Sequence, residues 1–294
     1  MTDAPSDDVA EAAYQGRPGA FSDVAARAFV GDAARLLPCP TFAAAVEALD
    51  AGRARRAVLP IVNAIAGGVG EALDLVATRA DLVVQGATTV PVAMALVAPP
   101  GVPFEAIRRV RSHPVALAQC RRFFAAHPHL APVVDFDTAG AVEAVVAEAR
   151  GDEAALASVR AAHVHGAAVL REGVQDHAAN ATRFLCLARA DAAGPVPGDT
   201  RAAAGPLRLA VWTGPDADLV RVLAACEADG WRLRHLERRP APEGPGLGRF
   251  VLELSRIAPG GAAEALSGSG DPRAVEVRGT YREVPTAGGI STQL

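Results

Sequence analysis

The 294 residues carry a formal net charge of −4, and half of them are hydrophobic. A chain of this length is sufficient for two compact domains, and its slight negative charge excludes the basic face of a general nucleic-acid or anionic-membrane binder. Aromatic residues make up only 4% of the chain, so its core must be packed mostly with small side chains.

Four cysteines stand far apart, as Cys39, Cys120, Cys186 and Cys226. They form no CxxC pair and no Cys/His cluster, so their spacing fits neither a zinc site nor a disulfide framework. The acidic start has no signal-type apolar run, and the longest apolar stretch, Val90 to Pro100, is about half of what a membrane span requires. The sequence therefore predicts a cytoplasmic protein without a metal site.

Short strands and helices are predicted to alternate through the first 190 residues, an order that favours an α/β architecture with a mostly parallel sheet. Strands are predicted at residues 12–15, 56–61, 82–85, 90–97, 110–112 and 133–136. Helices are predicted at residues 21–29, 41–51, 103–109, 116–126 and 140–150. Asp137 and Thr138 form a predicted N-cap before the last of these helices.

A Pro/Gly/Ala-rich stretch between Arg189 and Pro206 is the best linker in the chain. After it, strands are predicted at residues 207–212, 231–237, 248–254 and 274–278, and helices at 218–229 and 261–267. The resulting βαββαβ order is a ferredoxin-like arrangement with the size of a small regulatory domain.

Two polar segments are candidates for a binding site. Ser112-His113-Pro114 lies between a predicted strand and a helix, where open α/β sheets bind ligands and a helix N-terminus favours an anion; a simple helix cap is the alternative. Residues 180–184 (NATRF) combine an amide, a hydroxyl and a guanidinium, which can hold a carboxylate through two parallel hydrogen bonds; a surface turn is the alternative. No nucleotide-binding, zinc-protease or serine-hydrolase motif is present. The residues alone predict a two-domain α/β protein that binds a small anionic ligand in a cleft.

Five segments, taken in order, resemble the prephenate dehydratase family. They are residues 13–22 (AYQGRPGAFS), 59–64 (LPIVNA), 112–120 (SHPVALAQC), 137–141 (DTAGA) and 180–184 (NATRF). The resemblance implies a catalytic domain at about residues 9–190 with a two-lobed, periplasmic-binding-protein-like fold and an active site between the lobes. Lobe 1 would cover about 9–82 and 171–190, and lobe 2 about 83–170. A linker at 191–205 and an ACT regulatory domain at 206–285 would follow.

The resemblance also implies an activity, the conversion of prephenate to phenylpyruvate in phenylalanine biosynthesis. This lyase reaction releases carbon dioxide and water and needs no cofactor. Thr182 would hydrogen-bond or protonate the leaving ring hydroxyl, and because Thr is a weak acid its position must matter more than its acidity. Arg183 would clamp a carboxylate, and Phe184 would pack against the ring. The remaining predicted substrate lining consists of Asn63, Ser112, Thr138 and the backbone amides near Ser22.

The chain departs from the family segments at several polar positions. Val62 and Ala64 stand where the family has Glu and Ser, and Val115 stands where it has Gln. Losing such hydrogen-bonding groups can cost roughly a few kcal/mol each in transition-state stabilisation. Two alternatives therefore stay open: a prephenate decarboxylase that keeps the hydroxyl and yields a non-aromatic product, and a non-catalytic ligand-binding homologue. Retention of Thr182 favours dehydration.

The C-terminal unit resembles an ACT domain at two short segments. Residues 237–240 (ERRP) resemble the effector motif Glu-Ser-Arg-Pro, and residues 215–219 (PDADL) occupy the place of a Pro-Gly-Ala-Leu loop. In the family, phenylalanine binds there between two subunits, which implies a homodimer or homotetramer. Because an Asp in this loop lacks the freedom of Gly and adds negative charge, we expect weak or absent inhibition by phenylalanine. The candidate effector residues are Asp218, Leu219, Glu237 and Arg239.

Overall fold

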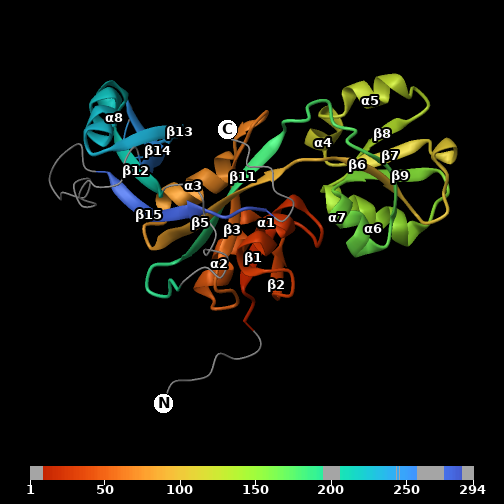
Figure 1. The fold of residues 1–294 in the computed structure, drawn as a ribbon, viewed down its shortest axis with the longest axis horizontal. Helices are drawn as coiled ribbons and strands as arrows, with labels where there is room; N and C mark the ends of the chain where they lie inside the picture. The colour runs from red at the N-terminus through yellow and green to blue at the C-terminus, as the bar shows by residue number, and fades with distance from the viewer. Residues whose placement is uncertain (1–8, 195–205, 243, 245, 257–274, 287–294) are drawn as a thin grey trace, which may run out of the picture.

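The computed structural model describes residues 9–194, 206–242, 244, 246–256 and 275–286. The first lobe is built from the N-terminal elements and one later strand (Figure 1). Its elements are β1 (Ala12–Gln15), α1 (Phe21–Val30), β2 (Leu36–Cys39), α2 (Phe42–Asp50), β3 (Ala57–Asn63), β4 (Gly67–Gly68), α3 (Gly70–Thr78), β5 (Leu82–Pro91) and β11 (Ala181–Arg189).

The second lobe is a separate five-stranded layer covered by helices, on the right of Figure 1. Its elements are β6 (Ala95–Ala98), the 3₁₀ turn η1 (Phe104–Ala106), β7 (Arg109–Ser112), α4 (Pro114–Ala118), α5 (Arg121–Ala126), β8 (Ala131–Val134), α6 (Thr138–Glu148), β9 (Glu153–Ala157), α7 (Val159–His165) and β10 (Ala168–Glu172). Its strand order is β10-β6-β9-β7-β8.

Both sheets are mixed, which corrects the prediction of a mostly parallel sheet. In the first lobe β1 pairs in parallel with β2 and β3, whereas β11 is antiparallel to β3 and β5. In the second lobe β7 is parallel to β8 and β9, while β6 is antiparallel to β9 and β10. The chain leaves the first lobe along β5 and returns along β11, so these two long neighbouring strands run in opposite directions. β5 belongs to the sheet of the first lobe, although residue 83 was expected to begin the second.

Two predicted helices of the second lobe are shorter than expected. The helix predicted at 103–109 is one 3₁₀ turn, because the chain is already extended at Arg109, where β7 pairs with β8 and β9. The helix predicted at 116–126 is two helices, α4 and α5, separated at Gln119 and Cys120. The carboxylate of Asp176 accepts hydrogen bonds from the backbone N–H groups of Arg121 and Arg122, and thereby caps the start of α5.

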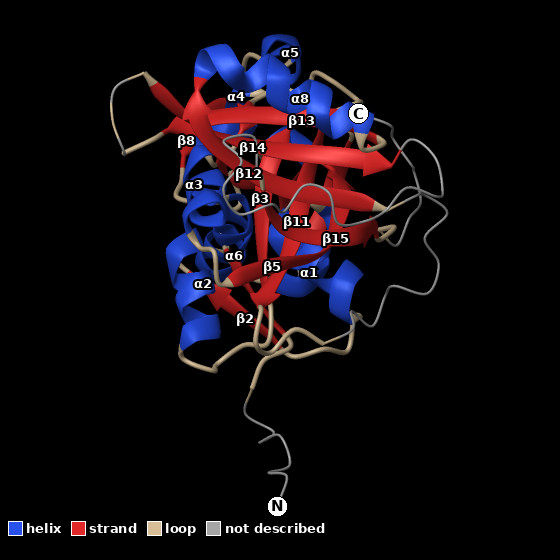
Figure 2. Cartoon of the chain, turned by 90° about the vertical axis from the view of Figure 1, so that its left-hand side faces the viewer, coloured by secondary structure: helices blue, strands red, loops and turns tan. Residues whose placement is uncertain are grey.

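The C-terminal unit continues the sheet of the first lobe (Figure 2). Its elements are β12 (Leu207–Pro215), η3 (Asp216–Asp218), α8 (Leu219–Ala228), β13 (Trp231–Pro240), β14 (Leu247–Arg256) and β15 (Glu276–Glu283). The helix predicted at 261–267 lies outside the described residues. The complete order is β13-β14-β12-β15-β5-β11-β3-β1-β2, with β4 paired to β3. A Cβ at Gly279 of β15 would lie 2.3 Å from the carbonyl oxygen of Val84 on β5, so this close approach of two backbones requires glycine.

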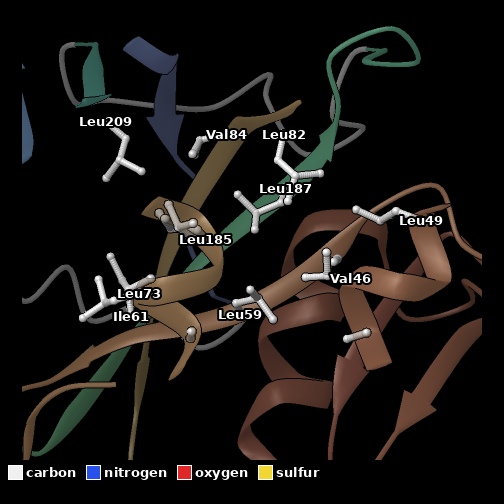
Figure 3. Packing of buried hydrophobic residues seen from close by; sticks show 14 of the residues in the cluster. Val46, Leu49, Leu59, Ile61, Leu73, Leu82, Val84, Leu185, Leu187 and Leu209 are labelled. Carbon is white, nitrogen blue, oxygen red and sulfur yellow. The ribbon is translucent and has the colours of Figure 1, made fainter. Parts of the chain in front are cut away.

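One hydrophobic cluster joins the first lobe and the C-terminal unit. It contains Leu73 of α3, Leu185 and Leu187 of β11 and Leu209 of β12 (Figure 3). Tyr281 of β15 belongs to the same cluster. Fully burying one such leucine stabilises a fold by roughly 2 kcal/mol. The two units therefore share a core as well as a sheet. No helix within the described ranges is long and apolar enough to cross a membrane.

Candidate active site between the two lobes

The two lobes are connected by a pair of crossing segments that are bonded to each other. One follows β5 and the other, residues 173–180, precedes β11. Val92 N–H donates to the carbonyl of Asn180 at 2.8 Å, and Val174 N–H donates to the carbonyl of Met94 at 3.0 Å. The backbone N–H of Met94 also donates to Gln175 Oε1 at 2.9 Å. These bonds tie the two connecting segments together, and the bonded pair of segments is called the hinge below.

Thr182 and Asn63 lie directly opposite each other on β11 and β3, where both strands leave this hinge. Asn63 Nδ2 donates to Thr182 Oγ1 at 2.9 Å, while Asn63 Oδ1 accepts from the N–H groups of Ile65 and Ala66 at 3.0 and 2.8 Å. The two backbone donors fix which end of the amide is oxygen. Thr182 Oγ1 therefore accepts from Asn63, and its own O–H is left to donate to a ligand.

A second amide extends this network into the other lobe. Asn180 is 2% exposed; its Oδ1 accepts from Asn63 Nδ2 at 2.9 Å, and its Nδ2 donates to Gln119 Oε1 at 3.0 Å. Gln119 is the C-cap of α4. The sequence points to the Asn180 amide only as part of a candidate binding segment and does not indicate its bond to Gln119. Together the three amides link the Thr182 hydroxyl to a helix of the second lobe.

Helix starts supply the other predicted binding groups. Thr138 is the half-buried first residue of α6, and Asp137 is its N-cap, whose carboxylate accepts from the N–H of Gly140, as predicted. Ser22 is the second residue of α1, and the N-cap of that helix, Ala20, makes no side-chain capping bond. The buried carboxylate of Asp23 already lies in this first turn and accepts from the N–H of Gly19 at 3.2 Å. Binding of a carboxylate by the amides near Ser22 therefore stays a prediction.

The prediction that Arg183 clamps a substrate carboxylate is wrong for this structure. Thr182 and Arg183 are successive residues of one strand, so their side chains point to opposite faces of the sheet. Arg183 is 4% exposed, and its guanidinium donates to Glu253 and Glu283 of the C-terminal unit. Burial opposes its charge, but these carboxylates raise the pKa of Arg183 above its ordinary value.

Two further predicted substrate contacts are also structural. Phe184 is 2% exposed and packs in the first-lobe core with Tyr14 and Phe29, so it forms no wall against a ligand. Ser112 has no exposed surface, and its hydroxyl donates to the carbonyl of Leu156 at 2.7 Å, which holds the end of β7 to β9. Val62 pairs with Arg183 and packs on the same core as Leu185. This departure from the family therefore lies behind the sheet, away from Thr182.

The candidate effector residues bond within the chain. Arg239 donates to both oxygens of Asp74 on α3, at 2.6 and 2.7 Å. Glu237 bonds to His235 and lies against Gly68, where an added Cβ would be 2.6 Å from the carboxylate. Asp218 accepts from Arg221 on its own helix. Leu219 packs against the core of the C-terminal unit. Glu237 and Arg239 thus face the first lobe.

Thiol chemistry is not available at this site. All four cysteines are buried, and burial raises the pKa of Cys120 and of Cys186 to about 12. A thiol of such a pKa is not ionised near neutrality and is a weak nucleophile. In the parts of the chain that are described, no three His, Cys, Asp or Glu residues gather as metal ligands would. The Thr182 hydroxyl, bonded to Asn63 at 2.9 Å, stays the predicted catalytic group.

Known proteins share this arrangement of segments. The family model described as prephenate dehydratase matches residues 12–192. Over 179 residues the chain is 42% identical to arogenate dehydratase 3, chloroplastic, of Arabidopsis thaliana, a match covering 60% of this chain and 42% of that protein. It is 40% identical over 186 residues to the bifunctional N-acyl-homoserine lactone acylase/prephenate dehydratase of Komagataeibacter europaeus, covering 63% and 65%. The match thus spans less than half the length of the Arabidopsis relative.

A solved structure extends the likeness over almost the whole chain. The crystal structure of prephenate dehydratase in complex with L-Phe from Arthrobacter aurescens superposes with a TM-score of 0.74 at 28% identity. The match covers 92% of this chain and 90% of that one, and it confirms the predicted two-lobed α/β fold. The five ordered segments all lie within residues 12–192, the range that the family model matches. The chain therefore belongs to the prephenate dehydratase family.

Proposed function

We propose that this protein is a dehydratase that converts prephenate to phenylpyruvate, carbon dioxide and water. The observation that carries the proposal is the Thr182–Asn63 pair at the hinge. There a hydroxyl accepts a hydrogen bond at 2.9 Å from a fixed amide and keeps its own proton for a ligand.

The chemistry needs little from the protein beyond position and hydrogen bonding. As the ring carboxylate leaves as carbon dioxide, its bonding electrons enter the ring and expel the ring hydroxyl, which departs as water after gaining a proton. Thr182 donates a hydrogen bond to that departing oxygen, and Asn63 keeps the threonine oxygen oriented. Such assistance is effective when the donor is held in place before the reaction. The forming aromatic ring drives the step, so no base is required at the ring.

Arogenate is a second candidate substrate. It carries an amino group where prephenate carries a side-chain keto group, and the ring chemistry is the same. The observation that favours it is the 42% identity to a protein named arogenate dehydratase. An amino-acid effector is also part of the proposal, because a protein in the same family has been crystallised with L-Phe. Weak inhibition by phenylalanine stays a prediction for this chain, in which Arg239 is bonded to Asp74.

The experiment that tests the proposal is a product assay with each substrate. Purified protein is incubated with prephenate or with arogenate at neutral pH, and the products are followed by NMR and ultraviolet absorbance beside a protein-free control. We expect phenylpyruvate from prephenate; faster formation of phenylalanine from arogenate would establish the second substrate instead. A non-aromatic decarboxylated acid, or unchanged prephenate that nevertheless binds, would contradict dehydration and support one of the two alternatives.

A further inference from the structure

A buried ionic cluster lies behind the candidate catalytic residue. Arg183 Nε and Nη2 donate to Glu253 Oε1 at 2.9 and 2.7 Å, and Nη1 donates to Glu283 Oε1 at 3.0 Å and to Thr89 Oγ1 at 3.2 Å. The hydroxyl of Tyr281 donates to the same oxygen of Glu253 at 2.7 Å. Burial and the Glu253 carboxylate raise the pKa of Tyr281 well above its ordinary value, so the phenol remains a donor. Three side chains, Glu253, Glu283 and Thr89, therefore accept hydrogen bonds from the guanidinium.

Both carboxylates of this cluster belong to the C-terminal unit. Glu253 is on β14 and Glu283 is at the end of β15. The residues paired with Arg183 on the two adjacent strands bring no charge, because Val62 lies opposite it on β3 and Thr89 on β5. A buried charge without a partner is strongly unfavourable. The position of Arg183 thus depends on acids that the first lobe does not supply.

The strand ladder around Arg183 is itself irregular. Arg183 pairs with Val62 of β3, but the next residue, Phe184, pairs with Pro60, so β3 carries an extra residue at this point. Such a bulge breaks the regular ladder and re-aims the side chains beside it. On its other side β11 pairs with β5 without a break from Ala181 to Cys186, so the irregularity affects only the β3 side of Thr182. The bonded guanidinium of Arg183 is a further restraint on β11 beside this bulge.

We propose that Arg183 is a positioning residue for Thr182, and that Glu253 and Glu283 fix it from the C-terminal unit. The inference rests on the proposed function, since it assigns a role in the reaction of Thr182. Arg183 shares a peptide bond with Thr182, so a displaced guanidinium moves the hydroxyl relative to Asn63. On this account two carboxylates of the C-terminal unit act on the reaction through Arg183.

A second contact supports Asn63 from the same side. β4 pairs with β3 at Asn63 and Val62 through Gly67 and Gly68. The carboxylate of Glu237 on β13 lies so close to Gly68 that a Cβ there would be 2.6 Å away. The C-terminal unit therefore contacts the residue that follows Thr182 on β11 and the strand that pairs with Asn63.

The test is the variant Glu253→Gln, which keeps the size of the side chain and removes its charge. We expect kcat to fall by about tenfold or more, because small displacements of a catalytic group have such effects, while KM stays within about twofold. The matched control is Asp74→Asn, which breaks the bidentate Arg239–Asp74 pair in the same interface but touches α3 instead of β11. Its kcat should equal that of the unmodified protein. Equal kcat losses in the two variants would overturn the proposal.

A double variant of Thr182 and Glu253 distinguishes a positioning role from a general loss of stability. In a Thr182→Ala background, Glu253→Gln should lower the residual kcat no further, although it should lower the melting temperature as before. Losses of kcat that multiply in the double variant would contradict a role exerted through Thr182. If Glu253→Gln does not fold, Glu283→Gln replaces it; the Glu283 side chain is 27% exposed, so the same pattern with a smaller loss is expected.

Amide hydrogen exchange tests the anchoring of β11 by a measurement that does not require enzymatic activity. Peptides covering residues 181–189 should exchange faster in Glu253→Gln than in Asp74→Asn, because only the first variant releases the anchor on β11. Equal exchange in that strand would overturn the positioning role even if both variants were active. Absence of dehydratase activity in the unmodified protein would instead refute the proposed function, and the exchange comparison would still report whether the anchor exists.

Discussion

At the scale of single residues, the candidate site consists of one hydroxyl and three neutral amides that are hydrogen-bonded in a chain. They are Thr182, Asn63, Asn180 and Gln119. Thr182 and Asn63 could be predicted from the sequence because each lies in a short segment with a family pattern. The link from Asn180 to Gln119 could not, because it joins residues 61 positions apart that only the hinge brings together. The resemblance implies that Arg183 clamps a carboxylate, because a guanidinium can hold one through two parallel hydrogen bonds. Strand geometry, with successive side chains on opposite faces, argues against that assignment.

Asn180→Ala tests the amide network. The change removes a buried amide and leaves Gln119 and Asn63 each without one partner, so we expect a loss of about 2 kcal/mol in the free energy of unfolding. We also expect a lower kcat, because Asn63 then orients Thr182 less firmly. Denaturant unfolding and steady-state kinetics measure the two effects.

Gln175→Ala provides the matched control for this network. Gln175 accepts from the backbone N–H of Met94 in the same hinge, whereas the side-chain bonds that reach Thr182 run through Asn63, Asn180 and Gln119. We expect this variant to lose stability and to keep its kcat. A wild-type kcat in Asn180→Ala would show that the network does not serve Thr182.

At the scale of elements, local pattern predicted the first lobe better than the second. The strand predicted at 12–15 is present with those bounds, and the helices at 21–29 and 41–51 are within one residue of α1 and α2 at each end. β9 was missed because its sequence, EAALA, consists of strong helix formers. It is nevertheless fully buried between β6 and β7, where pairing on both sides outweighs propensity.

The loop between β1 and α1 makes the principal contact with the second lobe on the side of α7. Ser158 donates to the carbonyl of Gly19 at 2.7 Å, and Arg160 donates to the buried carboxylate of Asp23 at 2.6 Å. A Cβ at Gly19 would lie 2.5 Å from the Cα of Ala161. Because the Cα of Ala161 is a backbone atom, it cannot move aside as a flexible side chain could. The two lobes can therefore come this close only when residue 19 is glycine.

Gly19→Ala should therefore hold the lobes apart. If the closed form falls to a tenth of its population, KM rises about tenfold, and small-angle scattering should show a larger radius of gyration. Gly31→Ala is the control, because Gly31 has the same φ of 91° and nothing within 4 Å of an added Cβ. It introduces equal backbone strain without the clash, and a similar KM in the two variants would contradict this role for Gly19.

At the scale of the whole molecule, the C-terminal unit and the first lobe are one structure. The composition of residues 189–206 predicts a linker between units, but linker composition carries no information on how units dock. The docking depends on the pairing of β15 with β5, on Gly279 and on the core shared through Leu209 and Tyr281. These are contacts between residues roughly 100 to 200 positions apart, which no local pattern reveals.

This joint architecture places one hydroxyl at the hinge, and Thr182→Val tests that placement most directly. Valine keeps the shape of threonine without its hydroxyl, and Asn63 Nδ2 retains its bonds to Asn180 and to the carbonyl of Ala181. The account predicts that kcat for prephenate falls by at least about 100-fold, while the melting temperature and the calorimetric affinity for the substrate change little. A Thr182→Val protein that forms phenylpyruvate at the rate of the unmodified protein would contradict the account.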